Sequence, residues 1–229
     1  MMAQQPDAAI TPPYRSTERI PATISRVTEE DLTGGRADVR IRRAPLEVEP
    51  IATRAPFEDR VRRFVHRMRP LIDRPDVLIM KAVAPGSSRV GAVAFWHRPG
   101  AAVSNCQKRN VAGMADETDE DREAYEQYDW ERWNSILQQY DDVRRRTMGD
   151  EPHWYLGPMF THPDFQGQGL AGQLLQHAIN LADAHDPAQP MYLEASPAGM
   201  PVYTRYGWVR IEGTPTAMLR RVPPAAKAE

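Results

Sequence analysis

Apolar residues recur every three or four positions in two stretches of the chain. The first stretch, FEDRVRRFVHRMRPLI at 57–72, has arginines between its apolar residues, and the second, LAGQLLQHAINLADAH, begins at Leu170. A period near 3.6 residues is the pattern of an amphipathic helix. We therefore predict a helix that ends near Pro70 and a second helix that packs its apolar face on a sheet.

Shorter apolar runs predict the strands of that sheet. VLIMKAVA at 77–84 and RVGAVAFWH at 89–97 are separated by the turn residues PGSS, which indicates an antiparallel hairpin. DVRIRR at 38–43 alternates apolar and basic residues, as an edge strand does. Further strands are predicted at 153–161, 190–196, 208–213 and 216–222. The last third therefore has the order strand, helix, strand, short helix, strand, strand, which favours a layered α/β domain of mixed α+β type.

The other segments lack such periods. Residues 1–38 are rich in proline, threonine, alanine and charge, so we expect a mobile N-terminal arm. Residues 98–150 are polar with a long helical middle, and we interpret them as a helical insertion in one domain that spans 39–222, followed by a tail at 223–229. Apolar residues of the insertion, among them Trp133 and Leu137, form a stripe that is typical of a packing surface and less often covers a groove.

Composition and charge disfavour several classes of partner. The chain has 29 basic and 31 acidic residues, and this balance gives no field that would hold a nucleic acid or an anionic membrane. Cys106 is the only cysteine, and the histidines lack metal-ligand spacing, so neither a disulfide framework nor a metal is expected. Without a secretory h-region or a run of about 20 apolar residues, we expect a cytoplasmic protein, with the nucleus as the alternative.

A glycine-rich loop, QGQGLAG at 166–172, joins a predicted strand to the second helix. Glycines allow a tight turn, and the free N–H groups of a first helical turn attract phosphate without a basic side chain. The loop therefore predicts a pyrophosphate site. A glycine-rich helix entry that binds nothing is the plain alternative.

The same glycines satisfy a dinucleotide-binding pattern. Gly167, Gly169 and Gly172 fit Gly-x-Gly-x-x-Gly, and Glu194 follows at about the 20-residue distance of the acidic ribose ligand. This reading would make the chain a nicotinamide-dependent dehydrogenase. It is disfavoured because HPDFQ separates the strand from the first glycine, and because too few residues follow Gly172 to complete a doubly wound sheet.

Two motifs together resemble one family. FTHPDFQGQGLAGQLL resembles motif A of the GNAT superfamily of N-acetyltransferases, with Gln166, Gly169 and Ala171 at the pattern positions. PVYTRYGW at 201–208 resembles the late signature of that family, an aliphatic residue, Tyr, three residues, Gly and an aromatic. The resemblance covers 153–212 and, more loosely, 38–97. It implies a GNAT-like twisted mixed sheet of six or seven strands flanked by helices.

The resemblance also implies acetyl-CoA as acyl donor, in a cleft between the strands near 154–161 and 191–196. The implied cofactor contacts are Met159, Phe160 and Thr161 for the pantetheine, Gln166, Gly167, Gln168, Gly169, Leu170, Ala171 and Gly172 for the pyrophosphate, and Ser196, where many members have Asn. Pro158 belongs at an edge or at a bulge where strands splay, or it simply ends the strand.

Two residues are candidates for catalysis. Tyr203 occupies the family position whose hydroxyl lies near the thioester sulfur and protonates the leaving thiolate; the alternative is a tyrosine packed on the sheet. An attacking amine must be neutral, so a base is needed, and Glu194 is one candidate and His153 another. A carboxylate at a strand end is more often solvated or paired. The acidic run at 116–121 would attract a cationic amine, or it is a solvated helix start.

The expected function is an acyl-CoA-dependent N-acyltransferase, an N-acetyltransferase that moves an acetyl group from acetyl-CoA to a small-molecule amine. The amine would attack directly in a ternary complex, without a metal, a nucleic acid or a membrane. A catalytically silent acyl-CoA-binding module is an alternative of another class, and the dehydrogenase is a third.

Overall fold

One mixed sheet organises the computed structural model, which describes residues 21–33, 56–126 and 129–222. Its seven strands lie in the order β1-β2-β3-β4-β5-β7-β6. The strands are β1 (Thr23–Arg26), β2 (Val77–Val83), β3 (Val90–His97), β4 (Trp154–Thr161), β5 (Met191–Glu194), β6 (Val209–Arg210) and β7 (Ala217–Arg220). All neighbours are antiparallel except β4 and β5. The predicted mixed sheet is confirmed, and the doubly wound alternative is wrong because that fold needs a mostly parallel sheet.

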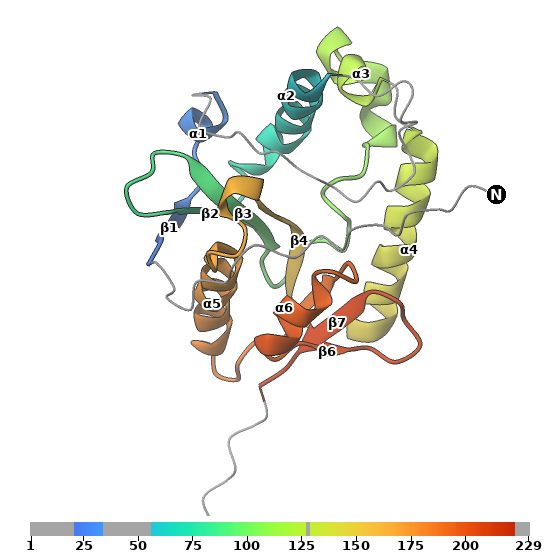
Figure 1. Cartoon of the computed structure of the whole chain (residues 1–229). Coiled ribbons are helices and arrows are strands. Elements are labelled where there is room, and N and C mark those ends of the chain that lie inside the picture. Colours follow the sequence, from blue (N-terminus) through green and yellow to red (C-terminus); the bar gives the residue numbers. More distant parts are fainter. Residues whose placement is uncertain (1–20, 34–55, 127–128, 223–229) are drawn as a thin grey trace, which may run out of the picture.

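Helices lie on both faces of this sheet (Figure 1). The α-helices are α1 (Glu29–Thr33), α2 (Phe57–Met68), α3 (Asp119–Tyr125), α4 (Trp130–Met148), α5 (Leu170–Asp183) and α6 (Met200–Arg205). Short 3₁₀ helices are η2 (Arg69–Leu71), η3 (Val111–Asp116) and η4 (Pro163–Phe165). The two predicted helices correspond to α2 and α5, and the predicted hairpin corresponds to β2 and β3.

Small side chains let α5 approach one face of the sheet closely. Ala82 of β2 and Ala92 and Ala94 of β3 lie in the same buried cluster as Leu174 and Leu175 of α5. A β-carbon on Gly91 would lie 2.4 Å from the Leu170 side chain and 3.1 Å from that of Phe165, so a larger residue here would displace side chains at the first turn of the helix. Burying each leucine contributes about 1.5–3 kcal/mol, which fixes the helix on the sheet.

Two separate clusters cover the opposite face. Phe64 of α2 makes edge-to-face contacts with Phe95 of β3 and Phe160 of β4, at 6.5 and 5.6 Å between ring centroids. Further along the sheet, Met148 at the end of α4 packs with Tyr155 of β4 and with β5 and β7. In Figure 1, α2 lies beside α3, and α4 runs down one side of the molecule. We call this the α4 face and the other the α5 face.

Part of the predicted mobile arm belongs to the sheet. β1 pairs antiparallel with β2, and Val27 after it is buried. Asp31 of α1 forms an ion pair with Lys81 of β2 and accepts the backbone N–H of Thr28 at 2.8 Å. The domain therefore begins before residue 39. A four-residue strand with half-buried positions has too little pattern to be recognised, and the edge strand predicted at 38–43 lies outside the described residues.

The apolar stripe of the helical insertion is a packing surface. Trp133 and Leu137 of α4 form a small buried cluster with partly buried neighbours on the same helix. The indole N–H of Trp133 donates to the carbonyl of Gln107 at 3.0 Å, which joins α4 to the loop before it. Tyr125 lies under the guanidinium groups of Arg67 and Arg109.

Candidate active site

β4 and β5 pair along only part of their length and then separate. The parallel ladder joins Trp154–Leu156 to Met191–Leu193, whereas β4 continues to Thr161. After β5 the chain turns toward β7, where the N–H of Ala195 donates to the carbonyl of Thr216 at 2.8 Å. Among the described residues, no strand therefore pairs with β4 beyond Leu156 on the β5 side.

A bulge in β4 lies at the point of separation. Met159 pairs with Ala94 and Leu156 with Trp96, so Gly157 and Pro158 together lie opposite the single residue Phe95. Proline has no N–H to donate to a ladder, and a bulge tolerates it. The bulge position for Pro158 is thus confirmed over the reading in which the proline ends the strand.

The glycine-rich loop presents free N–H groups at the start of α5. Gly167 and Gly169 both have positive φ, 80° and 82°, and no side chain caps the helix. The first helical bond runs from Gln173 N–H to Gly169 O at 3.1 Å, so the N–H groups of the three residues before Gln173 have no partner within the helix. A β-carbon on Gly167 would have no atom within 4 Å. The loop is open and presents donors at the positive end of the helix dipole.

The side chains of the loop brace it. Gln166 donates to the carbonyl of Thr161 at 3.3 Å, and Gln168 donates to the carbonyl of Asp164 at 3.0 Å. Gly172 is buried, and a β-carbon there would lie 2.1 Å from the Tyr206 hydroxyl. The missing side chain of Gly172 therefore serves the contact between α5 and α6, while its N–H remains among the free donors.

The remaining predicted cofactor contacts surround the separated strands. Met159 packs toward the α5 face, whereas Phe160 packs toward α2. With these side chains on opposite faces, a ligand between the strands would meet mainly the β4 backbone. Ser196 is exposed in the loop after β5, where its Oγ accepts the N–H of Gly199 at 3.2 Å.

Tyr203 lies on the α5 face. Its ring is buried and makes an edge-to-face contact with Trp208 at 6.1 Å. Burial raises the pKa of Tyr203 above its ordinary value, so the phenol is protonated at neutral pH. Tyr203 is thus packed against the sheet and also retains the proton that a general acid needs.

Glu194 lies on the α4 face, at the end of β5. Its Oε2 accepts the Tyr155 hydroxyl at 2.9 Å, and its Oε1 is shielded from solvent without a hydrogen-bond partner in the described part of the chain. Burial raises the pKa of Glu194 to about 7, although the Tyr155 hydroxyl and Arg144 act in the opposite direction. A carboxyl group with that pKa is suited to accept a proton near neutral pH.

Charged residues of α4 surround this carboxylate, and the sequence analysis missed them. Arg144 is 2 % exposed and lies 3.7 Å above the Tyr155 ring, and Asp141 is also buried. The signal was present in the helical pattern. The buried positions of α4 are Trp133, Leu137, Asp141, Arg144 and Met148, so the apolar stripe continues into two charged residues. A charge on the buried stripe of a helix indicates a polar site beneath it.

His153 is less suited than Glu194 to act as the base. It precedes β4, at the paired end of the two strands, and the bulge lies beyond Leu156. Its Nδ1 lies 2.7 Å from the carbonyl of Glu151, to which it donates.

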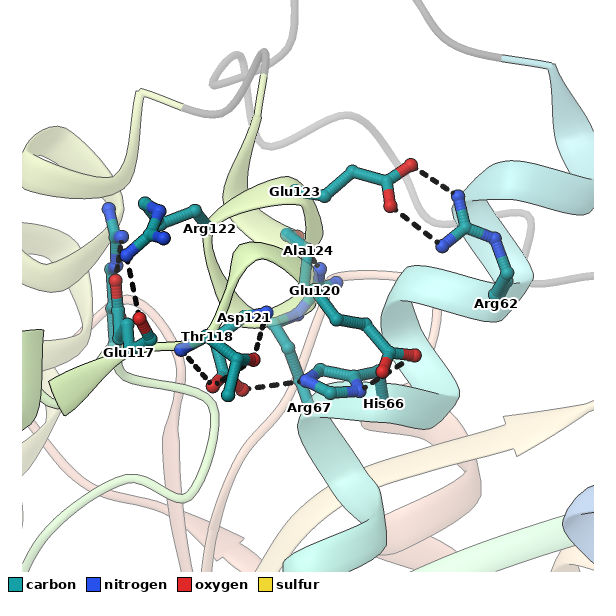
Figure 2. A network of polar contacts seen from close by, with 11 residues as sticks. Arg62, His66, Arg67, Glu117, Thr118, Glu120, Asp121, Arg122, Glu123 and Ala124 are labelled. Atoms are coloured by element: carbon teal, nitrogen blue, oxygen red, sulfur yellow. Dashed lines mark hydrogen bonds and ion pairs between the residues drawn. The ribbon is translucent and has the colours of Figure 1, made fainter.

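Much of the acidic run of the insertion contacts histidine and arginine side chains of the same protein (Figure 2). Asp121 lies 2.7 Å from His66 of α2, and just beyond the run Glu123 forms two contacts with Arg62 at 2.5 and 3.1 Å. Glu117 pairs with Arg109 within the insertion. The contacts with His66 and Arg62 hold α3 against α2, as Figure 2 shows, and all of these pairs favour a structural role for the run over attraction of a substrate.

Neither a metal site nor a membrane span is found in residues 21–33, 56–126 and 129–222. No three His, Cys, Asp or Glu side chains gather there as a metal would require. None of the helices in these ranges combines the length and apolarity of a transmembrane segment.

Solved structures share this fold. A structure titled histone acetyltransferase HPA2 and related acetyltransferase, from Corynebacterium glutamicum, aligns with a TM-score of 0.56 and 22% identity over 90% of this chain and 99% of that one. A mosquito arylalkylamine N-acetyltransferase-like protein aligns with a TM-score of 0.54 and 14% identity over 84% and 85%. An agmatine N-acetyltransferase aligns with a TM-score of 0.50 and 12% identity over 83% and 84%. At these identities the likeness shows the fold.

A family model matches the sequence itself. The model of the acetyltransferase (GNAT) domain matches residues 142–218, about a third of the chain, from α4 to β7. No curated protein matches the sequence. The resemblance to the GNAT superfamily is therefore confirmed, and the chain has the GNAT acetyltransferase fold, with its matching segment around the separated strands β4 and β5.

Proposed function

We propose that this protein is an acyl-CoA-dependent N-acetyltransferase that transfers the acetyl group of acetyl-CoA to a small-molecule amine. One observation carries the proposal. The two candidate catalytic side chains lie on opposite faces of the sheet where β4 and β5 separate, Tyr203 with the α5 cluster and Glu194 against α4. A thioester between the strands would then meet its leaving-group acid from one face and its attacking amine from the other.

Acetyl-CoA fits the chain at two places. The free N–H groups at the start of α5 and the positive helix end suit its pyrophosphate, and the open space at Gly167 leaves room for it. The unpaired edge of β4 suits the amide groups of the pantetheine, which would lie against it like an added strand. The bulge at Gly157 and Pro158 is where the thioester would lie.

The reaction needs proton transfers both at the acceptor nitrogen and at the departing sulfur. The acceptor ammonium loses a proton to Glu194, and the nitrogen lone pair attacks the thioester carbonyl carbon. As the carbon–sulfur bond breaks, Tyr203 donates its proton to the departing thiolate, which leaves as free coenzyme A. The nitrogen, cationic after the attack, gives its second proton to the Tyr203 phenolate, and Glu194 releases its proton to solvent. The net products are an N-acetyl amide, the free thiol and one proton, and no covalent enzyme intermediate forms.

Titration calorimetry with acetyl-CoA and with NADH tests the donor site. Gly167→Trp blocks the open loop, and Gly213→Trp is the matched control, because Gly213 also has positive φ and open space but lies in the turn between β6 and β7. We expect acetyl-CoA binding that Gly167→Trp abolishes and Gly213→Trp preserves. No binding of acetyl-CoA by the folded protein, or a preference for NADH, would refute the proposal.

Thiol release in the presence of amines tests the transfer. The acceptor panel is an arylalkylamine, agmatine and a basic histone-like peptide, which the names of proteins with this fold suggest, together with a polyamine. We expect turnover with a small amine. Binding of acetyl-CoA without thiol release for any acceptor would instead identify a silent acyl-CoA-binding module.

A further inference from the structure

A chain of hydrogen bonds runs from the helical insertion to Glu194. Asp141 of α4 accepts the backbone N–H of Asn105 at 3.1 Å and also pairs with Lys108. The side-chain Nδ2 of Asn105 lies 2.8 Å from the Tyr155 hydroxyl, which in turn lies 2.9 Å from Glu194 Oε2. The insertion therefore reaches the proposed base through two intermediate side chains.

The direction of each hydrogen bond in this chain is fixed. Asn105 Oδ1 accepts the backbone N–H of Gln107 at 3.0 Å, and a backbone N–H only donates. The amide of Asn105 must therefore turn its Nδ2 toward Tyr155 and donate to the phenol oxygen. Since that oxygen already accepts from Asn105, the single proton of Tyr155 is directed to Glu194 Oε2.

The other groups near Glu194 do not compete for Oε2. On β5, the Tyr192 hydroxyl is buried and outside hydrogen-bond geometry, and it lowers the pKa of Glu194 less than the Tyr155 hydroxyl does. On α4, Arg144 stacks on the Tyr155 ring and Asp141 lies behind Asn105. On β3, the His97 ring is 5.5 Å from the ring of Tyr155. Within the described residues, Tyr155 is the group that meets hydrogen-bond geometry with the carboxylate, at Oε2, and Oε1 has no partner at that distance.

We propose that Asn105 and Tyr155 are positioning residues that hold Oε2 of Glu194 and leave Oε1 to take the proton of the acceptor amine. The inference rests on the proposed function, in which Glu194 is the base. It gives the helical insertion a role in the active site: the insertion supplies Asn105 and, through Asp141, the group that fixes the loop carrying it. The acceptor amine supplies the partner that Oε1 lacks.

Direct titration of Glu194 tests the contact without relying on catalysis. The carboxyl carbon of Glu194, labelled with ¹³C and assigned with Glu194→Gln, is followed by NMR from pH 4 to 9 in the full chain. Tyr155→Phe removes the donor to the carboxylate, so the midpoint is expected to rise by about one pH unit. Asn105→Asp places an acceptor where the donor stood and draws the Tyr155 proton away, so the midpoint is again expected to rise.

Tyr192→Phe is the matched control, because it deletes a hydroxyl on the same face that lies outside hydrogen-bond geometry and acts on Glu194 more weakly than Tyr155. In Tyr192→Phe, the titration midpoint of Glu194 is expected to move by less than half as much as in Tyr155→Phe. In the acyl-transfer assay, kcat/KM of Tyr155→Phe should fall about tenfold at pH 6.5 and recover by pH 9, since the higher pKa shifts only the acidic limb.

The outcomes separate this inference from the proposed function. An unchanged midpoint in a folded Tyr155→Phe protein would overturn the inference even if the enzyme is active. A raised midpoint without thiol release for any amine would support the hydrogen-bond chain and contradict the proposed function. Should Asn105→Asp fail to fold, Tyr155→Phe decides alone.

Discussion

Gly172 of α5 and Tyr206, the residue after α6, approach so closely that a β-carbon on the glycine would lie 2.1 Å from the phenol oxygen. Alanine favours a helix over glycine by about 1 kcal/mol, but displacing the ring costs about 1–3 kcal/mol. We expect Gly172→Ala to lower the free energy of unfolding by about 1 kcal/mol, measured by urea denaturation.

A substitution at Tyr206 supplies the control for the Gly172→Ala prediction. Tyr206→Phe removes the oxygen that the new methyl group meets, so it should restore part of the stability in the Gly172→Ala background. A stabilising effect of Gly172→Ala alone would contradict the contact.

Tyr203 is expected to act on the leaving group. Because burial raises its pKa, it stays protonated between pH 6 and 9 and does not set the basic limb of the profile. Tyr203→Phe should lower kcat about 100-fold, with acetyl-CoA affinity unchanged by calorimetry. Tyr206→Phe, the neighbouring tyrosine, should keep its turnover, and equal losses in both variants would argue against the role of Tyr203.

Substitution of Cys106 tests whether the reaction proceeds without a covalent enzyme intermediate. A β-carbon on Gly157 would lie 3.5 Å from Cys106 Sγ, so the thiol is near the bulge where we propose that the thioester binds. Direct attack by the amine requires no enzyme nucleophile. Cys106→Ser should therefore retain most of its turnover in the thiol-release assay, and an inactive but folded variant that binds acetyl-CoA would favour transfer through the cysteine.

His97 should make the protein less stable in acid. Burial, together with Arg144 and Arg74, lowers the pKa of His97 from 6.5 to about 4. The unfolded chain takes up a proton below pH 6.5 that the folded chain accepts only near pH 4, so stability falls across this window as pH decreases. The full loss is about 3 kcal/mol.

Glu194 has the opposite effect on the pH dependence of stability. Its pKa is about 7 in the folded state and 4.5 ordinarily, so the folded protein loses stability as pH rises from 4.5 to 7. Comparing His97→Gln with the unchanged chain cancels that contribution. Relative to the unchanged chain, the variant should gain stability between pH 7.5 and pH 4 in urea denaturation. A difference that does not vary with pH would show that His97 titrates normally in the folded protein.

Asp121 should hold the start of α3. Thr118 and Asp121 cap each other's backbone N–H groups, and Asp121 also contacts His66 of α2. We expect Asp121→Ala to cost about 1 kcal/mol locally and to speed hydrogen exchange of residues 119–125 about fivefold. Asp119→Ala removes an acidic residue from the same helical turn, where the side chain is 98% exposed. Equal exchange in the two variants would contradict the cap.

The sequence by itself determined the helices, strands and turns whose residue pattern is local. Three local features depend on contacts within one element or one turn: the apolar residues of α5 every three or four positions, the consecutive apolar residues of β2 and β3, and the glycines before Leu170. Such patterns identify an element without its neighbours. The proline bulge followed in the same way from the missing N–H of Pro158, which restricts where that residue fits in any sheet.

Only the tertiary structure decided the surroundings of Glu194. Asn105, Tyr155 and Glu194 come from a loop and two strands, and no local pattern relates residues so far apart in the chain. The pairing of β1 with β2 was equally hidden, because a four-residue edge strand gains its stability from its neighbour. The sequence therefore determined the elements and the open glycine-rich loop before α5, whereas the long-range packing of α4 on the sheet decided how the Glu194 carboxylate is held and how its proton affinity is set.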